Sequence, residues 1–68
     1  MSVIVFGSAG CGKSKHKNAL ATHFGLSVIV DEWRPGVELP DNALALTNVT
    51  DIEGAIDFAE VAFELNLF

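Results

Sequence analysis

The sequence predicts a small α/β domain, with a mostly parallel sheet of three to four strands and two helices, formed by residues 1–68 as one unit. Short apolar runs rich in β-branched residues alternate along the chain with segments of helical character. Half of the residues are hydrophobic and 19% are charged, which favours a packed domain over a disordered chain. A chain of 68 residues is also too short for two hydrophobic cores.

The first half of the chain predicts a strand, a helix and a second strand. Val3 to Phe6 is an apolar run ended by Gly7, so we expect a strand buried on both faces. Lys13 to Phe24 contains no Gly or Pro, and Gly25 follows where a left-handed C-cap is favoured, which predicts a helix. Ser27 to Asp31 is expected to be a second buried strand, parallel to the first because crossovers of this kind are right-handed.

The middle of the chain predicts a loop and a third strand. Two turn pairs, Pro35-Gly36 and Pro40-Asp41, indicate that residues Trp33 to Asn42 cross the molecule as a loop without a helix. Ala43 to Thr47 then reads as a strand, and Ala55-Ile56 as a brief fourth strand.

The end of the chain predicts a second helix. Asp57 followed three residues later by Glu60 is the pattern of a capping box, which places a helix from Phe58 to about Asn66. Its spacing of apolar residues predicts one buried stripe. The stripe consists of Phe58, Val61, Ala62 and Leu65.

Charge is distributed unevenly along the chain, whose net charge is −5. Residues 1–30 carry three lysines and no acidic residue, whereas residues 31–68 carry nine acidic residues and Arg34 alone. One electropositive spot on an acidic body argues against broad nucleic-acid binding, which needs a basic face. A compact anion is the better match for such a spot.

The remaining composition points to a cytoplasmic protein. Cys11 is the single cysteine, so no internal disulfide can form, which fits a reducing compartment. No apolar run is long enough to cross a membrane, and the start of the chain lacks the features of a signal peptide. We therefore expect no membrane association.

The most informative segment is Gly7-Ser8-Ala9-Gly10-Cys11-Gly12-Lys13-Ser14, which fits G-x-x-x-x-G-K-[ST] in full. It resembles the Walker A loop of P-loop NTPases, and it lies between a predicted buried strand and a predicted helix as that loop requires. The resemblance covers about residues 2–32 and implies a truncated P-loop-like βαβ core. It also implies that ATP or another phosphate anion binds with Mg²⁺. The binding residues implied are Gly7, Gly10, Cys11, Gly12, Lys13 and Ser14.

The physical chemistry of the segment supports an anion independently of the resemblance. The amino end of a helix carries a partial positive charge and favours acidic residues, yet this one carries Lys13, Lys15 and Lys17. A bound phosphate would reverse that repulsion. In the family, the lysine at position 13 would neutralise phosphate oxygens and the Ser14 hydroxyl would bind Mg²⁺. The alternative is a glycine-rich turn followed by a solubilised surface helix.

Two acidic residues, Asp31 and Glu32, follow the apolar run Val28-Ile29-Val30, which resembles a Walker B strand. The resemblance implies that Asp31 supports Mg²⁺ together with Ser14, and that Glu32 positions a water molecule. These acidic residues come earlier in the chain than in the usual pattern. A polar strand end turning into solvent is the alternative.

Two further pairs have a structural and a functional interpretation. Thr47-Asn48 ends a predicted strand and could sense a phosphate, but a turn is favoured. Trp33-Arg34 could stack on a base or anchor an interface, or Trp33 could cover the sheet. Metal binding by His16 and His23 is not expected, because no third ligand accompanies them.

Two functions remain open at this point. The first is a phosphate- or nucleotide-binding protein with slow or absent hydrolysis, similar to short P-loop chains encoded by phages and prophages. The second is an acidic interaction protein that inhibits a host complex, for example as an anti-CRISPR inhibitor, and keeps the loop only as structure. The apolar residues Phe63, Leu65, Leu67 and Phe68 would then supply a contact surface, or the seam of a homodimer. Whether the protein is an enzyme is left open.

Overall fold

A computed structural model describes residues 2–7 and 15–66 of the chain. In these residues the order of elements is β1 (Val3–Phe6), α1 (Lys17–Phe24), β2 (Val28–Val30), β3 (Ala43–Thr47), β4 (Ile56–Asp57) and α2 (Phe58–Glu64). The four strands form one sheet in the order β2-β3-β1-β4, and every neighbouring pair is parallel. The predicted fold class, a small parallel sheet with two helices, is confirmed.

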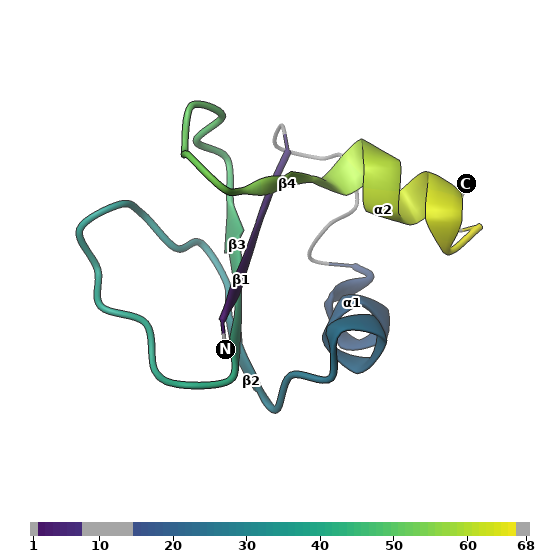
Figure 1. The fold of residues 1–68 in the computed structure, drawn as a ribbon, viewed down its shortest axis with the longest axis horizontal. Coiled ribbons are helices and arrows are strands. Elements are labelled where there is room, and N and C mark those ends of the chain that lie inside the picture. Colours follow the sequence, from purple (N-terminus) through teal and green to yellow (C-terminus); the bar gives the residue numbers. More distant parts are fainter. Residues whose placement is uncertain (1, 8–14, 67–68) are drawn as a thin grey trace.

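Both helices cover the same face of the sheet, as Figure 1 shows. The strand register explains which residues they cover, because Val5 pairs with Leu46 in β3 and Val3 pairs with Leu44. Side chains paired in this way point to the same face. They form the core with the buried residues of the two helices, which are Leu20, Ala21, Phe58, Val61 and Ala62.

The opposite face of the sheet is covered by the loop of residues 31–42 (Figure 1). Trp33 is the buried residue of this loop, with 8% of its surface exposed. Its backbone N–H donates to the carbonyl of Leu46 at 2.8 Å, and its indole N–H donates to the carbonyl of Val37 at 2.8 Å. At the other end of the loop, the Ser2 hydroxyl donates to the carbonyl of Pro40 at 2.8 Å. The loop is therefore held to the sheet at both ends.

Gly25 ends α1 and Asp57 is the N-cap of α2, as the sequence predicts, but the Asp57 bond reaches Ala59 and not Glu60, so the reciprocal capping box is not formed. Gly25 ends α1 with a φ of 70°, in the left-handed region, and its N–H bonds to carbonyls of the last turn. The Asp57 carboxylate accepts a hydrogen bond from the Ala59 N–H at 2.9 Å at the start of α2. Of the predicted stripe, Phe58, Val61 and Ala62 are buried and Leu65 packs against the core.

The prediction of a second buried strand over Ser27 to Asp31 is wrong. Residue Val28 is 37% exposed, and the strand covers only Val28–Val30. The cause is the strand order, because β3 pairs between β1 and β2 and leaves β2 at the edge of the sheet. An edge strand of three residues is covered less completely than a central one.

Element boundaries differ from the predicted ones by a few residues. Helix α1 begins at Lys17, because Lys15 and His16 form a turn; residues 13 and 14 lie outside the described part. The brief strand β4 includes Asp57, and α2 ends at Glu64 rather than at residue 66. In the described part of the chain, neither helix is long and apolar enough to span a bilayer.

Candidate functional site

The carboxyl ends of the four strands meet at one edge of the sheet, which we call the carboxyl edge. Open parallel sheets bind ligands at this edge, because the loops that follow the strands gather there. The segments that follow the strands begin at this edge, with Gly7 after β1, Asp31 after β2, Asn48 after β3 and the start of α2 after β4. The residues predicted to bind a ligand all follow β1, β2 or β3.

Gly7 is the described member of the predicted phosphate-binding set. It is buried, and its N–H donates to the carbonyl of Thr47 at 3.1 Å, which extends the pairing of β1 with β3 by one residue. The other members, Gly10, Cys11, Gly12, Lys13 and Ser14, lie outside the described residues. Their roles in binding phosphate therefore stay predictions. In the sequence they lie between the central strand β1 and the helix α1.

The amino end of α1 lacks the usual stabilising groups. Its N-cap residue, His16, makes no side-chain capping bond, and the first turn contains no acidic residue. Lys15 is exposed and Lys17 is half-buried beside this end. The His16 ring stacks on Phe58 of α2, with 6.4 Å between ring centroids. His16 therefore contributes to packing between the helices.

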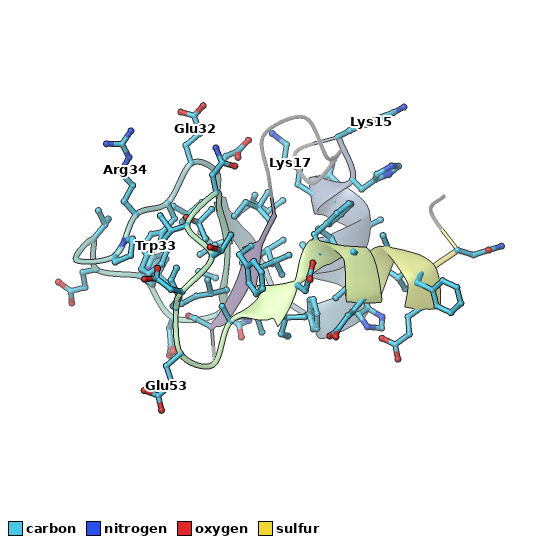
Figure 2. All side chains as sticks on the ribbon, turned by 90° about the horizontal axis from the view of Figure 1, so that it is seen from above. Lys15, Lys17, Glu32, Trp33, Arg34 and Glu53 are labelled. Carbon is cyan, nitrogen blue, oxygen red and sulfur yellow. The ribbon has the colours of Figure 1, made fainter. Side chains whose placement is uncertain are left out.

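Arg34 lies on the same side of the molecule as the two lysines, at the end away from Lys15. Figure 2 shows Lys15, Lys17 and Arg34 on one side of the molecule, together with Glu32, whereas Glu53 lies on the opposite side. Sequence reasoning did not place Arg34 on the side of the lysines, because it lies 17 or more positions from them in the chain. The position of Arg34 shortly after a predicted parallel strand could have indicated its location, because the carboxyl ends of parallel strands lie at one edge of the sheet.

Asp31 and Glu32 are exposed at the end of β2. The Asp31 carboxylate accepts a hydrogen bond from the Glu32 N–H at 2.9 Å, and Glu32 has a positive φ of 56°. Because β3 lies between β2 and β1, Asp31 is two strand spacings, about 9.5 Å, from the line of β1. Among the described residues there is no cluster of three or more metal-binding side chains.

Thr47 and Asn48 lie next to the end of β1, where the sequence interpretation was divided. Thr47 is 1% exposed, and its hydroxyl oxygen accepts a hydrogen bond from the Val49 N–H at 3.1 Å. This bond shapes the turn after β3, so the turn interpretation of Thr47 is confirmed. Asn48 is exposed at the same edge.

A hollow of about 770 Å³ lies between the ends of β2 and β3. The segment after β2 lines it with Glu32, Trp33 and Arg34, and the segment after β3 lines it with Asn48 and Val49. Trp33 is buried and its backbone N–H bonds to Leu46 of β3, which favours the interpretation that Trp33 covers the sheet.

Asp57 occupies the other side of β1. It pairs in register with Phe6, the last residue of β1, and its carboxylate caps α2. The end of the central strand therefore has a polar turn on one side and a carboxylate on the other. Any anion bound after β1 would lie near this negative charge.

Comparison of the chain with protein-family models, with curated proteins and with solved structures gave no match. The function must therefore be inferred from the residues and the geometry of the carboxyl edge.

Proposed function

We propose that the protein binds a phosphate-bearing anion, such as ATP with Mg²⁺, through the loop that follows β1. The observation that carries the proposal is the uncapped amino end of α1, which has no acidic residue in its first turn and has Lys15 and Lys17 beside it. This helix follows the Walker A-like sequence, which itself follows a central strand of a parallel sheet. Sequence and position in the fold thus support the same ligand.

Electrostatics supports the same conclusion. An unfavourable charge at a helix end costs about 0.3–1 kcal/mol at an exposed site. An anion at this end would interact favourably both with the helix dipole and with the lysines.

The residues present fit Mg²⁺ chemically. This ion is commonly held by one or two carboxylates, phosphate oxygens and water. Ser14 and Asp31 would hold it, with Asp31 acting through water because its strand is two positions from β1. Bound Mg²⁺ would neutralise phosphate charge.

We further propose that hydrolysis is slow or absent. Fast phosphoryl transfer requires exclusion of water and closure over the terminal phosphate. Both helices lie on one face of the sheet and the 31–42 loop lies on the other (Figure 1). Within the described residues, no helix or strand therefore crosses over the carboxyl edge.

Thermal unfolding with Mg-ATP, Mg-GTP and inorganic phosphate tests the proposal. At 100 times its Kd a ligand adds about 2.7 kcal/mol to the free energy of unfolding. For a chain of this size that corresponds to a rise in Tm of roughly 11–22 °C. The Lys13→Ala variant should lose this rise, while Glu53→Gln, at the opposite edge, should keep it. The proposal fails if no anion raises the Tm, or if the rise persists in Lys13→Ala.

The outer face of α2 favours a second candidate function, an acidic interaction protein. Phe63 is 82% exposed on this helix, and Glu60 and Glu64 beside it are also exposed. An exposed aromatic residue between acidic residues suits a basic protein surface, such as the nucleic-acid groove of a CRISPR complex.

Binding to such a complex should weaken with salt, and the variant Glu60→Lys with Glu64→Lys should weaken it further. Inhibition of the complex's DNA binding, measured across ionic strength, checks this. If neither salt nor charge reversal changes the affinity, acidic recognition is excluded. Lys13→Ala should leave this inhibition unchanged, which separates the two functions.

A further inference from the structure

We infer that the hollow between the ends of β2 and β3 is a second binding site, distinct from the loop after β1. We propose that it takes a small molecule with an anionic group and, close to it, a hydroxyl or ammonium donor. The proposal concerns described residues only and stands whether or not the loop after β1 binds a nucleotide.

The charges that line the hollow determine the chemistry of its ligand. Glu32 and Arg34 flank the buried Trp33 in the chain, and both project outward on the same side (Figure 2). Among the described residues, no ion pair joins the Glu32 carboxylate to the Arg34 guanidinium. The guanidinium presents donors that match a carboxylate or a phosphate, whereas the Glu32 carboxylate only accepts. A ligand that satisfies both must carry an anion and a donor.

The other three lining residues, Trp33, Asn48 and Val49, supply one polar and two largely apolar walls. Asn48 adds a polar wall, and the half-buried Val49 adds an apolar contact. Because the indole N–H of Trp33 is bonded to Val37, the ring contributes a fixed wall and no free donor. A volume of about 770 Å³ lies within the usual range for small-molecule sites.

The backbone around the hollow is preorganised by hydrogen bonds. Asp31 holds the turn that carries Glu32, and the Trp33 N–H bonds to Leu46 of β3. Across the hollow, the Thr47 hydroxyl accepts from the Val49 N–H. The two walls therefore follow neighbouring strands, and their backbone needs little ordering when a ligand binds, which leaves only the ordering of side chains as a cost.

Two sources could supply such a ligand, and two probes distinguish them. Ribose 5-phosphate combines a phosphate with hydroxyl groups, and an L-amino acid combines a carboxylate with an ammonium group. Each has a matched analogue that lacks the anion, namely ribose and the amino-acid amide. The chain contains one Trp and no Tyr, so its fluorescence reports directly on Trp33 in the wall of the hollow.

We expect one of the two probes to change the Trp33 emission with a Kd of about 1 mM or tighter. Its analogue without the anion should bind at least about tenfold more weakly, a difference of 1.4 kcal/mol. Arg34→Gln and Glu32→Gln should each weaken binding severalfold, and Arg34→Lys should not restore it fully, because a lysine lacks the planar fork. Glu53→Gln, at the opposite edge, should bind as the wild type does.

Three outcomes would overturn the inference. The first is that neither ribose 5-phosphate nor any of the L-amino acids changes the emission of Trp33 or the NMR shifts of the Asn48 and Val49 amides. The second is that Arg34→Gln binds the probe as the wild type does. The third is that Lys13→Ala abolishes binding of the probe, which would place the anion at the loop after β1. Binding of the probe that persists in Lys13→Ala while Mg-ATP stabilisation is lost would support two separate sites.

Discussion

Replacing Trp33 with phenylalanine should lower the free energy of unfolding by about 2 kcal/mol. The indole N–H donates to the Val37 carbonyl at 2.8 Å, and losing a hydrogen bond of this kind costs about 1 kcal/mol. The ring is 8% exposed, so the smaller phenyl group leaves a void whose cost is about another 1 kcal/mol. Domains of this length have a total stability of about 3–10 kcal/mol, which makes the loss large.

Circular dichroism during thermal and urea unfolding measures the effect without relying on tryptophan emission. The expected loss corresponds to a fall in Tm of roughly 8–16 °C for a chain of this size. Phe63→Ala is the matched control, because Phe63 is an aromatic residue that is 82% exposed, and its removal should change stability by less than about 0.5 kcal/mol. If Trp33→Phe unfolds with the wild-type midpoint, Trp33 does not hold the 31–42 loop to the sheet.

Three further predictions concern Asp57 and Gly25, the residues at two of the helix ends. Asp57→Ala should lower the free energy of unfolding by about 1 kcal/mol, because the bond to the Ala59 N–H is lost. Asp57→Asn should keep this bond, since asparagine is also a good N-cap. If urea unfolding gives the same loss of stability for both variants, the prediction is wrong. Asp57→Asn should also strengthen Mg-ATP binding, measured by calorimetry, because it removes a negative charge beside β1. Gly25→Ala should lower the free energy of unfolding by about 1 kcal/mol, because the φ of 70° at this position is unfavourable for a residue with a Cβ atom. The cause is conformational and not steric crowding, since a Cβ atom at Gly25 would have no atom within 4 Å beyond its neighbours in the chain. An unchanged denaturation midpoint would show that the end of α1 rearranges freely.

The local elements were predictable where short-range chemistry decides them. Ala43–Thr47 is apolar and contains no breaker, and it is the strand whose five residues are all buried. Gly25 and Asp57 mark helix ends because their conformational and hydrogen-bonding preferences act within one turn. The boundary of α1 was less predictable, because no Gly or Pro between Lys13 and Lys17 marks where the helix begins.

The strand order was not predictable from the residues that form the strands. Val28-Ile29-Val30 has the composition of a buried strand, yet it lies at the edge of the sheet. Its exposure follows from the insertion of β3 between β1 and β2, which is a long-range event. The same event moves Asp31 away from the line of β1 and brings Thr47 next to Gly7.

Local sequence thus contains a Walker A-like segment and determines the carboxyl end of α1, the amino end of α2 and the apolar strands, because each depends on residues within a few positions of one another. The assembly of the carboxyl edge depends instead on which strands pair. Parallel pairing places Arg34 on the same side of the molecule as Lys15 and Lys17, although at the other end of that side, and it forms a hollow from segments separated by more than ten residues. Strand pairing is set by the joint burial of all the apolar faces, a property of the whole chain that no single segment encodes.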